Sequence, residues 1–408
     1  MPPAWFRPRT YRHFDVPVGE AFADKCNTPA FVEQHSWSPL ISYVKRLKRY
    51  KPKLKKTVFK DRMIMYASHR DACIMSRYAA EVSRLLEEAY VEHGLAEAVI
   101  AYRKLGKSNY DFAASALHFA RAGAPCVVLC FDVTGFFDNL DHAILKRRLA
   151  DLIGSDRLPK DWYAVFKAVT KYHHVERGDL DAHPVIGERM KSRSHQPAAT
   201  IAEVRQEGIP IKRSTTPGRG IPQGTPISAA LSNVYMWGLD VAMLAACGAV
   251  GALYQRYSDD ILIVCPQAAE ASLTKALEDS LAALKLEIAT DKTERALFDP
   301  LDPEVVQYLG FNICPTGTSI RPSSLARQWR KAHRMLRHTG RVGAEAVAAG
   351  RAPKVYTSKV RKRLLPIGVR NFSSYARRSA RAFGSKQIVR QVRRLERMVE
   401  RTLAEMNP

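Results

Sequence analysis

Two adjacent carboxylates, Asp259 and Asp260, are the residues of this chain most suited to chemistry. They end the segment YSDD at residues 257–260, which lies between apolar residues 253–254 and 261–264. Two short apolar runs around a polar pair predict a β-hairpin with the acids at its turn. Neighbouring carboxylates repel each other, so a fold tends to hold them together where a cation offsets their charge. The alternative is an ordinary turn, in which Asp is common.

A third acid, Asp132, follows the continuous apolar run at residues 126–131. Such a run is typical of a strand buried on both faces, and helical spacing follows at residues 144–152. If this strand lies beside the hairpin, three carboxylates meet. Mg²⁺ binds one or two carboxylates together with substrate phosphates, and two ions about 4 Å apart stabilise an in-line phosphoryl transfer. Taken alone, Asp132 could simply cap its strand.

Five segments resemble, in the same order, the palm motifs of reverse transcriptases. They are FDVTGFFD at residues 131–138, GIPQGTPIS at 220–228, YSDD at 257–260, LEI to DKT at 286–293 and YLGF at 308–311. One motif could arise by chance, whereas the ordered set is specific. The resemblance implies an α+β right-hand polymerase with fingers, an antiparallel-sheet palm and a helical thumb. It also implies RNA-directed DNA synthesis with two Mg²⁺ ions, for which Mn²⁺ could substitute.

The resemblance also assigns roles by position. It makes Asp132, Asp259 and Asp260 the catalytic acids and, together with Val133, the metal positions. It makes Lys292, near the outgoing pyrophosphate, a candidate general acid. Further roles are nucleotide binding for Arg103, Lys104, Phe137, Gln223 and Gly224, and a primer grip at Tyr308, Leu309 and Gly310.

Three of these assignments have a physical basis and an alternative. A ring at Phe137, the implied steric-gate position, would collide with a ribose 2′-OH, although Phe is usually a core residue. The segment Pro-Gln-Gly at residues 222–224 suits close approach of backbone to a nucleotide, or it is a turn before a predicted helix over 229–239. Arg103 and Lys104 occupy the implied triphosphate position, or they belong to one more basic loop.

Positive charge is concentrated towards the C-terminus. Residues 321–408 carry 23 lysines and arginines against four acids, or +19, whereas the rest carries 41 against 36, or +5. Such asymmetry indicates a polyanionic partner. Apolar residues at helical spacing over 388–406 leave Arg390, Arg394 and Arg397 free to face outward and bind nucleic acid. A merely solvated helix face is the alternative, but such faces usually mix signs.

Two further segments are less distinctive. Residues 45–62 hold ten lysines and arginines against the single Asp61, with aromatics interleaved. This pattern suits nucleic acid or a solvated linker. Residues 154–219 contain His173, His174, His183 and His195, whose spacing is poor for zinc, so a fingers segment is expected instead.

The seven cysteines form no Cys-x-x-Cys pair, and several lie in apolar runs, which predicts reduced thiols and a cytoplasmic location. The first residues lack the apolar core of a signal peptide. No segment is expected to span a membrane, because Asn233 and Asp240 interrupt the apolar stretch at residues 229–253.

We predict three parts: an N-terminal extension and fingers at 1–125, a palm at 126–318 with a fingers segment inserted at about 154–219, and a basic helical thumb at 319–408. The expected partners are template RNA, a primer or priming group, dNTPs and the cDNA product. No RNase H, integrase or Cys/His-rich endonuclease segment is evident, which disfavours retroviral and mobile-intron enzymes. An RNA-dependent RNA polymerase or primase is disfavoured by Phe137.

The sequence of residues 222–228 and 231–236 resembles that of the bacterial defence-associated reverse transcriptases, in particular their type 2. That resemblance implies that a dedicated noncoding RNA is copied and that the activity protects against phage. A retron or group II intron-derived enzyme is the nearest alternative. A catalytically silent RNA-binding protein with a polymerase fold is an alternative of another class.

Overall fold

The computed structural model describes residues 3–51, 56–214, 216–367 and 370–406; for residues 49–51 the description covers the backbone alone. The basic run predicted at 45–62 therefore lies partly outside the described residues. Chain contacts define two units. The first contains Met1–Arg103, Val133–Ala242 and Leu277–Ile288, and the second contains Lys104–Asp132, Met243–Ala276 and Ala289–Pro408. The predicted three-part division stays a prediction.

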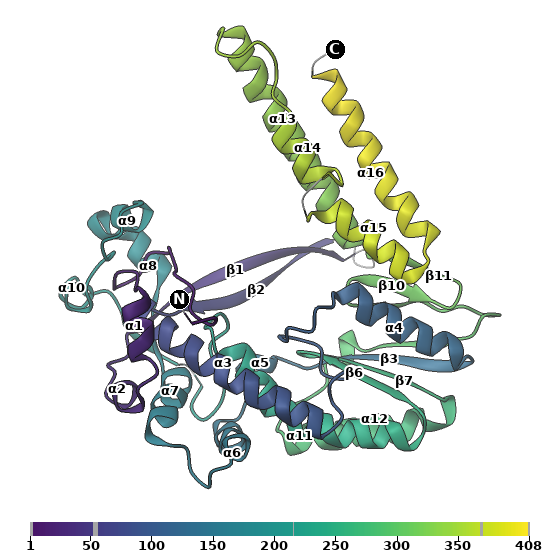
Figure 1. Cartoon of the computed structure of the whole chain (residues 1–408), viewed down its shortest axis with the longest axis horizontal. Coiled ribbons are helices and arrows are strands. Elements are labelled where there is room, and N and C mark those ends of the chain that lie inside the picture. Colours follow the sequence, from purple (N-terminus) through teal and green to yellow (C-terminus); the bar gives the residue numbers. More distant parts are fainter. Residues whose placement is uncertain (1–2, 52–55, 215, 368–369, 407–408) are drawn as a thin grey trace. The chain divides into compact units, whose positions relative to one another are not determined.

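The first unit is mainly helical (Figure 1). Its elements are α1 (Glu20–Lys25), α2 (Pro29–Glu33), β1 (Leu40–Lys51), β2 (Lys56–Tyr66), α3 (His69–Glu92), α5 (Phe136–Asn139), α6 (His142–Ile153), α7 (Lys160–Thr170), β4 (His173–Glu176), α8 (Arg177–Ala182), α9 (Pro184–Lys191), α10 (Ile201–Gln206) and β5 (Lys212–Arg213). Its sheet has the order β2-β1-β4-β5.

Strands β1 and β2 form a long antiparallel ribbon. Only Leu40 to Ser42 of β1 pair with β4, and the remaining described residues of β1 pair with β2 alone. Arg46 binds Asp61 across the ribbon through two hydrogen bonds of 2.9 and 2.8 Å. The basic segment is therefore regular strand structure, so the linker alternative was wrong, while nucleic-acid binding there stays a prediction.

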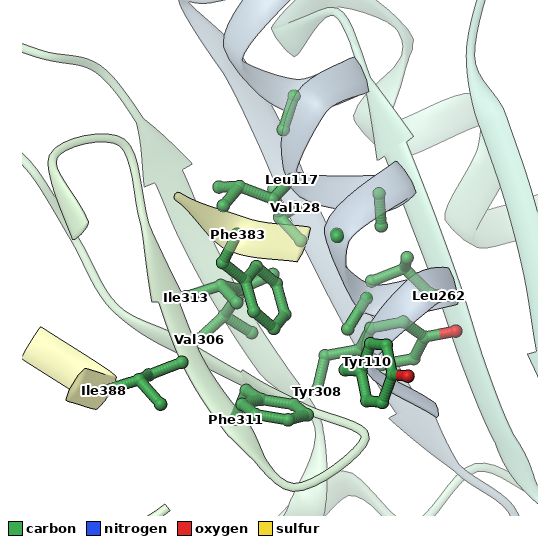
Figure 2. Packing of buried hydrophobic residues seen from close by; sticks show 14 of the residues in the cluster. Tyr110, Leu117, Val128, Leu262, Val306, Tyr308, Phe311, Ile313, Phe383 and Ile388 are labelled. Carbon is green, nitrogen blue, oxygen red and sulfur yellow. The ribbon is translucent and has the colours of Figure 1, made fainter. Parts of the chain in front are cut away.

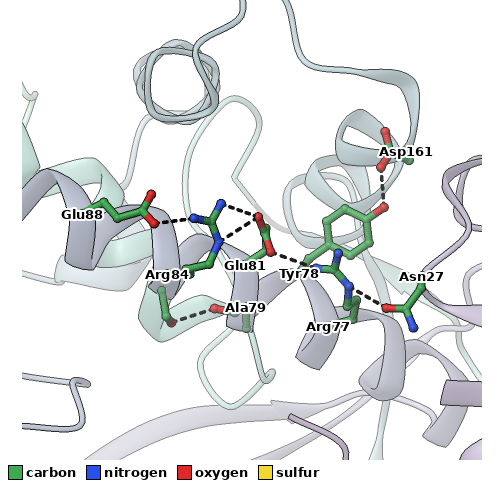
Figure 3. Close-up of polar contacts among 9 residues, drawn as sticks. Asn27, Arg77, Tyr78, Ala79, Glu81, Arg84, Glu88 and Asp161 are labelled. Atoms are coloured by element: carbon green, nitrogen blue, oxygen red, sulfur yellow. Dashed lines mark hydrogen bonds and ion pairs between the residues drawn. The ribbon is translucent and has the colours of Figure 1, made fainter. Parts of the chain in front are cut away.

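Helix α3 is fixed by a cap at its start and by polar contacts along its length, of which Figure 3 shows those from Arg77 to Glu88. The Ser68 side chain accepts a hydrogen bond from the backbone N–H of Asp71 and caps the helix. Arg84 pairs with Glu81 and Glu88 at spacings of three and four residues. The Tyr78 hydroxyl donates to Asp161 of α7 at 2.5 Å, which ties the two helices together in the interior.

The second unit contains α4 (Asn109–Ala122), β3 (Cys126–Asp132), β6 (Leu253–Tyr257), β7 (Asp260–Cys265), β8 (Glu294–Phe298), β9 (Val306–Tyr308), β10 (Phe311–Cys314), β11 (Gly317–Ile320), α13 (Pro322–Ala348), α14 (Ser358–Leu364), α15 (Phe372–Phe383) and α16 (Lys386–Glu405). Helices α11 (Ser228–Ala249) and α12 (Glu270–Ala283) each run from one unit into the other.

A four-stranded antiparallel sheet of order β6-β7-β3-β8 lies at the centre of the second unit. The predicted buried strand and the predicted hairpin are neighbours in it, as expected. Side chains from β3 and β7 share one core with α4 and with the second sheet, β11-β10-β9 (Figure 2). In that core Phe311 packs against Phe383 of α15, with ring centroids 4.8 Å apart. The C-terminal helices are thus anchored on the sheets.

Helices α13, α14 and α16 share a second, smaller core. It contains Ala332 and Leu336 of α13, Val360 of α14, and Leu395, Val399 and Leu403 of α16. Arg377 of α15 forms two hydrogen bonds, of 3.0 and 2.6 Å, with the buried Glu396 of α16. The helical structure predicted for the C-terminal part is confirmed.

Two minor predictions can also be compared with the structure. All seven cysteines are free thiols, as predicted. The prediction that no segment is apolar enough for a membrane span was wrong for α11, which is the one such helix among the described residues by length and composition. However, 61% of its apolar window is buried in the protein, and the helix carries the buried Asn233 and Asp240. Those features are typical of a core helix.

Candidate active site

The two acids of the central hairpin are held by a tight turn. Tyr257 at the end of β6 pairs with Asp260 at the start of β7, so only Ser258 and Asp259 form the turn. Ser258 has a φ of 62°, in the left-handed region that two-residue hairpin turns require. The predicted hairpin with its turn at the acids is confirmed.

Asp132 lies directly opposite Asp260 across β3 and β7. Cross-strand partners project to the same face of a sheet, with Cβ atoms about 5 Å apart. Burial raises the pKa of Asp260 to about 7, and the charges of Asp259 and Asp132 add to the rise. Arg321 and Lys292 oppose it. The fold therefore gathers negative charge at one place, and an additional cation would stabilise it.

Lys292 reaches this acid pair. Its Nζ donates a hydrogen bond to Oδ1 of Asp132 and forms an ion pair with it. The backbone supports this approach, because the N–H of Ala289 donates to the carbonyl of Asp132 at 2.7 Å. The lysine predicted as general acid is therefore brought to the predicted acids, while its catalytic role stays a prediction.

The chemistry of the donor set fits Mg²⁺. Carboxylate oxygens are hard ligands, and two of them face each other on neighbouring strands. Within the described residues, no group of three or more His, Cys, Asp or Glu side chains lies close enough to form a preformed metal site. The acids would thus hold ions only together with substrate phosphates. Val133, the fourth predicted metal position, is buried and forms a bridge with Ile288.

Arg256 is a residue that sequence reasoning missed. It precedes Tyr257 on β6, is fully buried, and donates from Nη1 to the carbonyl of Ser258 at 3.1 Å. A buried guanidinium thus braces the turn that carries Asp259. The available signal was a lone Arg inside an apolar strand, which requires a specific partner when buried.

The predicted primer grip forms a second tight hairpin turn, between β9 and β10. Tyr308 pairs with Phe311, and Leu309 and Gly310 both have positive φ, 45° and 92°. The buried Tyr308 hydroxyl donates to Oε1 of Gln255 at 3.2 Å. The carbonyl of Gly310 accepts the N–H of Arg321 at 3.1 Å. The turn is thus fixed from both sides, and its contact with a primer stays a prediction.

The predicted nucleotide-binding residues of the first unit differ in their surroundings. Phe136 is buried, whereas Phe137 is only half-buried and meets Phe136 edge to face at 5.4 Å. The core-packing alternative therefore suits Phe136 better than Phe137. The carbonyl of Gln223 accepts the N–H of Met65 at 2.8 Å. A Cβ at Gly224, where φ is +113°, would lie 2.6 Å from the Met65 carbonyl, so glycine is required there.

The two basic residues predicted to bind nucleotide, Arg103 and Lys104, differ in their exposure to solvent. The side chain of Arg103 is only 4% exposed; its guanidinium pairs with Glu87 at 2.6 Å and stacks on Tyr90. It is thus engaged inside the protein, whereas Lys104 is exposed. The nucleotide roles of both stay predictions, and these contacts favour Lys104.

The C-terminal basic positions are accessible. Arg390, Arg394 and Arg397 are all exposed on α16, as the helical spacing predicts. The apolar residues between them, among them Val392 and Leu395, are buried. Binding of nucleic acid by these arginines stays a prediction.

The model of the family "Reverse transcriptase (RNA-dependent DNA polymerase)" matches residues 68–313, more than half of the chain. The chain belongs to the reverse transcriptase family. The matched segment contains the acid pair, the hairpin turn, Lys292 and the predicted primer grip. The α+β fold class and the reverse transcriptase family predicted from the sequence are thereby confirmed.

Solved telomerase structures resemble the chain at low sequence identity. Apo telomerase from Candida tropicalis, truncated from its C-terminal domain, is 10% identical with a TM-score of 0.46, covering 69% of this chain and 56% of that chain. Telomerase from Candida albicans in complex with a TWJ fragment of telomeric RNA is 14% identical with a TM-score of 0.47, covering 94% and 68%. The chain thus spans little more than half of the first of these proteins. No curated protein matches the sequence.

Proposed function

We propose that this reverse transcriptase family member is an RNA-directed DNA polymerase that uses two Mg²⁺ ions. The observation that carries the proposal is the pairing of Asp132 with Asp260 across β3 and β7, with Asp259 in the adjoining turn and Lys292 in contact. The substrates would be a template RNA, a primer or priming group, and dNTPs.

The reaction is attack of a primer 3′-OH on the α-phosphate of a dNTP, with pyrophosphate leaving. When bound, the ions supply charge stabilisation for the attacking and leaving oxygens. Asp132, Asp259 and Asp260 would hold them, and the charges of Asp259 and Asp132 beside Asp260 favour a bound cation. Lys292 carries its proton on Nζ beside Asp132, within reach of the acids, where a departing pyrophosphate would accept it.

Asp132→Asn and Asp259→Asn test this assignment. Each change removes a metal-binding charge at nearly constant side-chain size, so dNTP incorporation should be abolished while RNA binding persists. Primer extension and an RNA-binding titration should be measured on the same preparations. Incorporation by either variant near the wild-type rate would overturn the metal assignment.

One observation favours the silent RNA-binding alternative. Lys292 already pairs with Asp132, and the described residues contain no preformed three-ligand site. A silent protein would incorporate no dNTP even as wild type, at any Mg²⁺ or Mn²⁺ concentration, whereas a polymerase would lose incorporation only in the Asp→Asn variants.

We further propose that the enzyme copies a dedicated noncoding RNA in the bacterial cytoplasm and acts in antiphage defence. The resemblance of residues 222–228 and 231–236 to defence-associated reverse transcriptases supports this, as does the net charge of +24. Nucleic acid that co-purifies with the chain should be sequenced, and phage plating compared between wild type and Asp132→Asn. Equal plating would contradict the defence role. Recovered intron or retron RNA would indicate those origins instead.

A further inference from the structure

Helix α13 presents a continuous basic stripe. It is made by six exposed residues at helical spacing, with Arg330 and Lys331 adjacent: Arg327, Arg330, Lys331, Arg334, Arg337 and Arg341. This spacing places them on one helix face over about 21 Å. Together with His333, the residues from Arg327 to Arg337 line a groove of about 780 Å³. We call these six residues the α13 stripe.

The α13 stripe lies opposite the packed side of its helix. Ala332 and Leu336, the buried residues of α13, belong to the core shared with α16. At about 100° per residue, Arg334 and Arg341 project roughly 180° away from that pair. The stripe therefore faces away from α16.

Helix α16 repeats the arrangement. Its exposed arginines, Arg390, Arg393, Arg394, Arg397 and Arg401, form the α16 stripe. The buried Val392, Leu395 and Val399 lie on the other side of the helix, in or beside the core shared with α13. Within the described ranges, none of Arg390, Arg394 and Arg397 pairs with a carboxylate. This stripe is thus available to a ligand.

The two stripes face in opposite directions, because α13 and α16 turn their apolar sides towards a common core. Packed helices lie about 8–10 Å apart axis to axis, and each has a radius of about 5–6 Å with its side chains. The stripes are therefore about 20 Å apart on opposite sides of a helical layer. A straight duplex on one stripe cannot contact the other.

The α13 stripe continues from the acid site. Arg321, which immediately precedes α13, lies near enough to Asp260 to lower its pKa. Its backbone N–H also donates a hydrogen bond to the carbonyl of Gly310 in the predicted primer-grip turn. Arg327 follows Arg321 by six residues, which is about 9 Å along the helix axis. A duplex that leaves the acids would thus run along the α13 stripe.

Resting on the proposed function, we propose that the two stripes bind two different nucleic-acid segments. The α13 stripe holds the primer–template duplex, and the α16 stripe holds a separate folded, double-stranded segment of the template RNA. The α16 stripe consists of arginine alone, whose planar guanidinium suits paired hydrogen bonds to phosphate. This assignment explains why so much basic surface lies away from the acids.

Salt titration of binding tests the proposal. The triple variants are Arg327→Gln, Arg330→Gln and Arg334→Gln on α13, and Arg390→Gln, Arg394→Gln and Arg397→Gln on α16. Each is titrated with a short primer–template duplex and with the same duplex whose template RNA carries a separate hairpin. The matched control replaces the same α16 arginines by lysine, which keeps the charge. Circular dichroism melting monitors folding.

The α13 variant should lose about two to three units of salt slope with both ligands, at about 0.9 per contact. The α16 variant should lose that slope only with the hairpin-bearing RNA, and the lysine control should keep it. The proposal would be overturned if the α13 and α16 Gln variants lost equal salt slope with the short duplex. It would also be overturned if neither variant lost salt slope with either ligand. Unchanged RNA slopes combined with lost binding to polyglutamate or anionic vesicles would overturn it as well, and would indicate a protein or membrane partner.

A second measurement does not depend on the Gln variants folding. A photo-crosslinking residue at position 394 should label the RNA hairpin, and one at position 334 should label the primer–template duplex; labelling of the primer from 394 would contradict the proposal. Both experiments can be run on the Asp132→Asn chain and need no catalysis. Failure of the polymerase function would therefore be seen separately.

Discussion

The acid site and the basic helices place charge in two different ways. At the acid site, strand register puts Asp132 opposite Asp260, and a slip of one residue would turn one of them to the other face. On α13 and α16, many exposed basic residues repeat along a helix, and no single one is fixed by burial. Chemistry thus depends on a few exact positions, whereas binding is a sum of small, similar contributions. Sensitivity to substitution should differ accordingly.

The largest expected effect is that of Asp260→Asn. Removing this charge should lower dNTP incorporation by about 10³-fold or more, the scale of losing one group that stabilises transition-state charge. The same change should stabilise the metal-free chain, because it removes the repulsion between one carboxylate and two others. Primer extension and thermal unfolding in EDTA measure the two effects.

The matched control is Glu294→Gln, at a partly buried acid on β8 in the same sheet, since it removes one negative charge at nearly constant side-chain size. If Asp260→Asn lowered both activity and stability, the acid would be an ordinary structural residue.

The next effect concerns Arg256, which supports the turn that carries Asp259. Arg256→Lys keeps the charge but loses the guanidinium that reaches the carbonyl of Ser258. We expect kcat to fall by about tenfold, with the KM for dNTP nearly unchanged, because a misplaced turn affects the reacting geometry more than binding. Single-turnover kinetics at several dNTP concentrations would separate the two. A change confined to KM would argue against a positioning role.

A smaller and more selective effect is expected at Phe137. Phe137→Ala should lower the preference for dNTPs over rNTPs by about tenfold, since its half-buried ring would no longer meet a 2′-OH. Incorporation of dNTPs should be largely retained. Phe136→Leu serves as a core control, and unchanged sugar selection in Phe137→Ala would place the gate elsewhere.

The smallest effect is that of one arginine on a basic helix. Arg330→Gln should reduce the salt slope of primer–template binding by about 0.9 and leave the single-turnover rate of bound complexes unchanged. A loss of chemistry as large as that of an acid variant would remove the distinction between the two regions.

The sequence predicted the acid site better than the contacts around it. Apolar runs at residues 126–131 and 261–264 identified two strands, and their order placed three acids at strand ends. The burial of Arg103 was not predictable, because its partner Glu87 lies 16 positions away, on helix α3. Arg256 was missed since burial of an arginine depends on tertiary contacts. The direction of the α13 stripe depends on which side of the helix packs, which the sequence alone did not reveal.

The most direct test of the account is single-turnover incorporation of one dNTP on an RNA template, measured against Mg²⁺ concentration. The account predicts a cooperative rise with Mg²⁺, complete loss in EDTA, and no incorporation by Asp132→Asn although that variant still binds the template. Incorporation that is independent of divalent ions, or equally fast in Asp132→Asn, would contradict it.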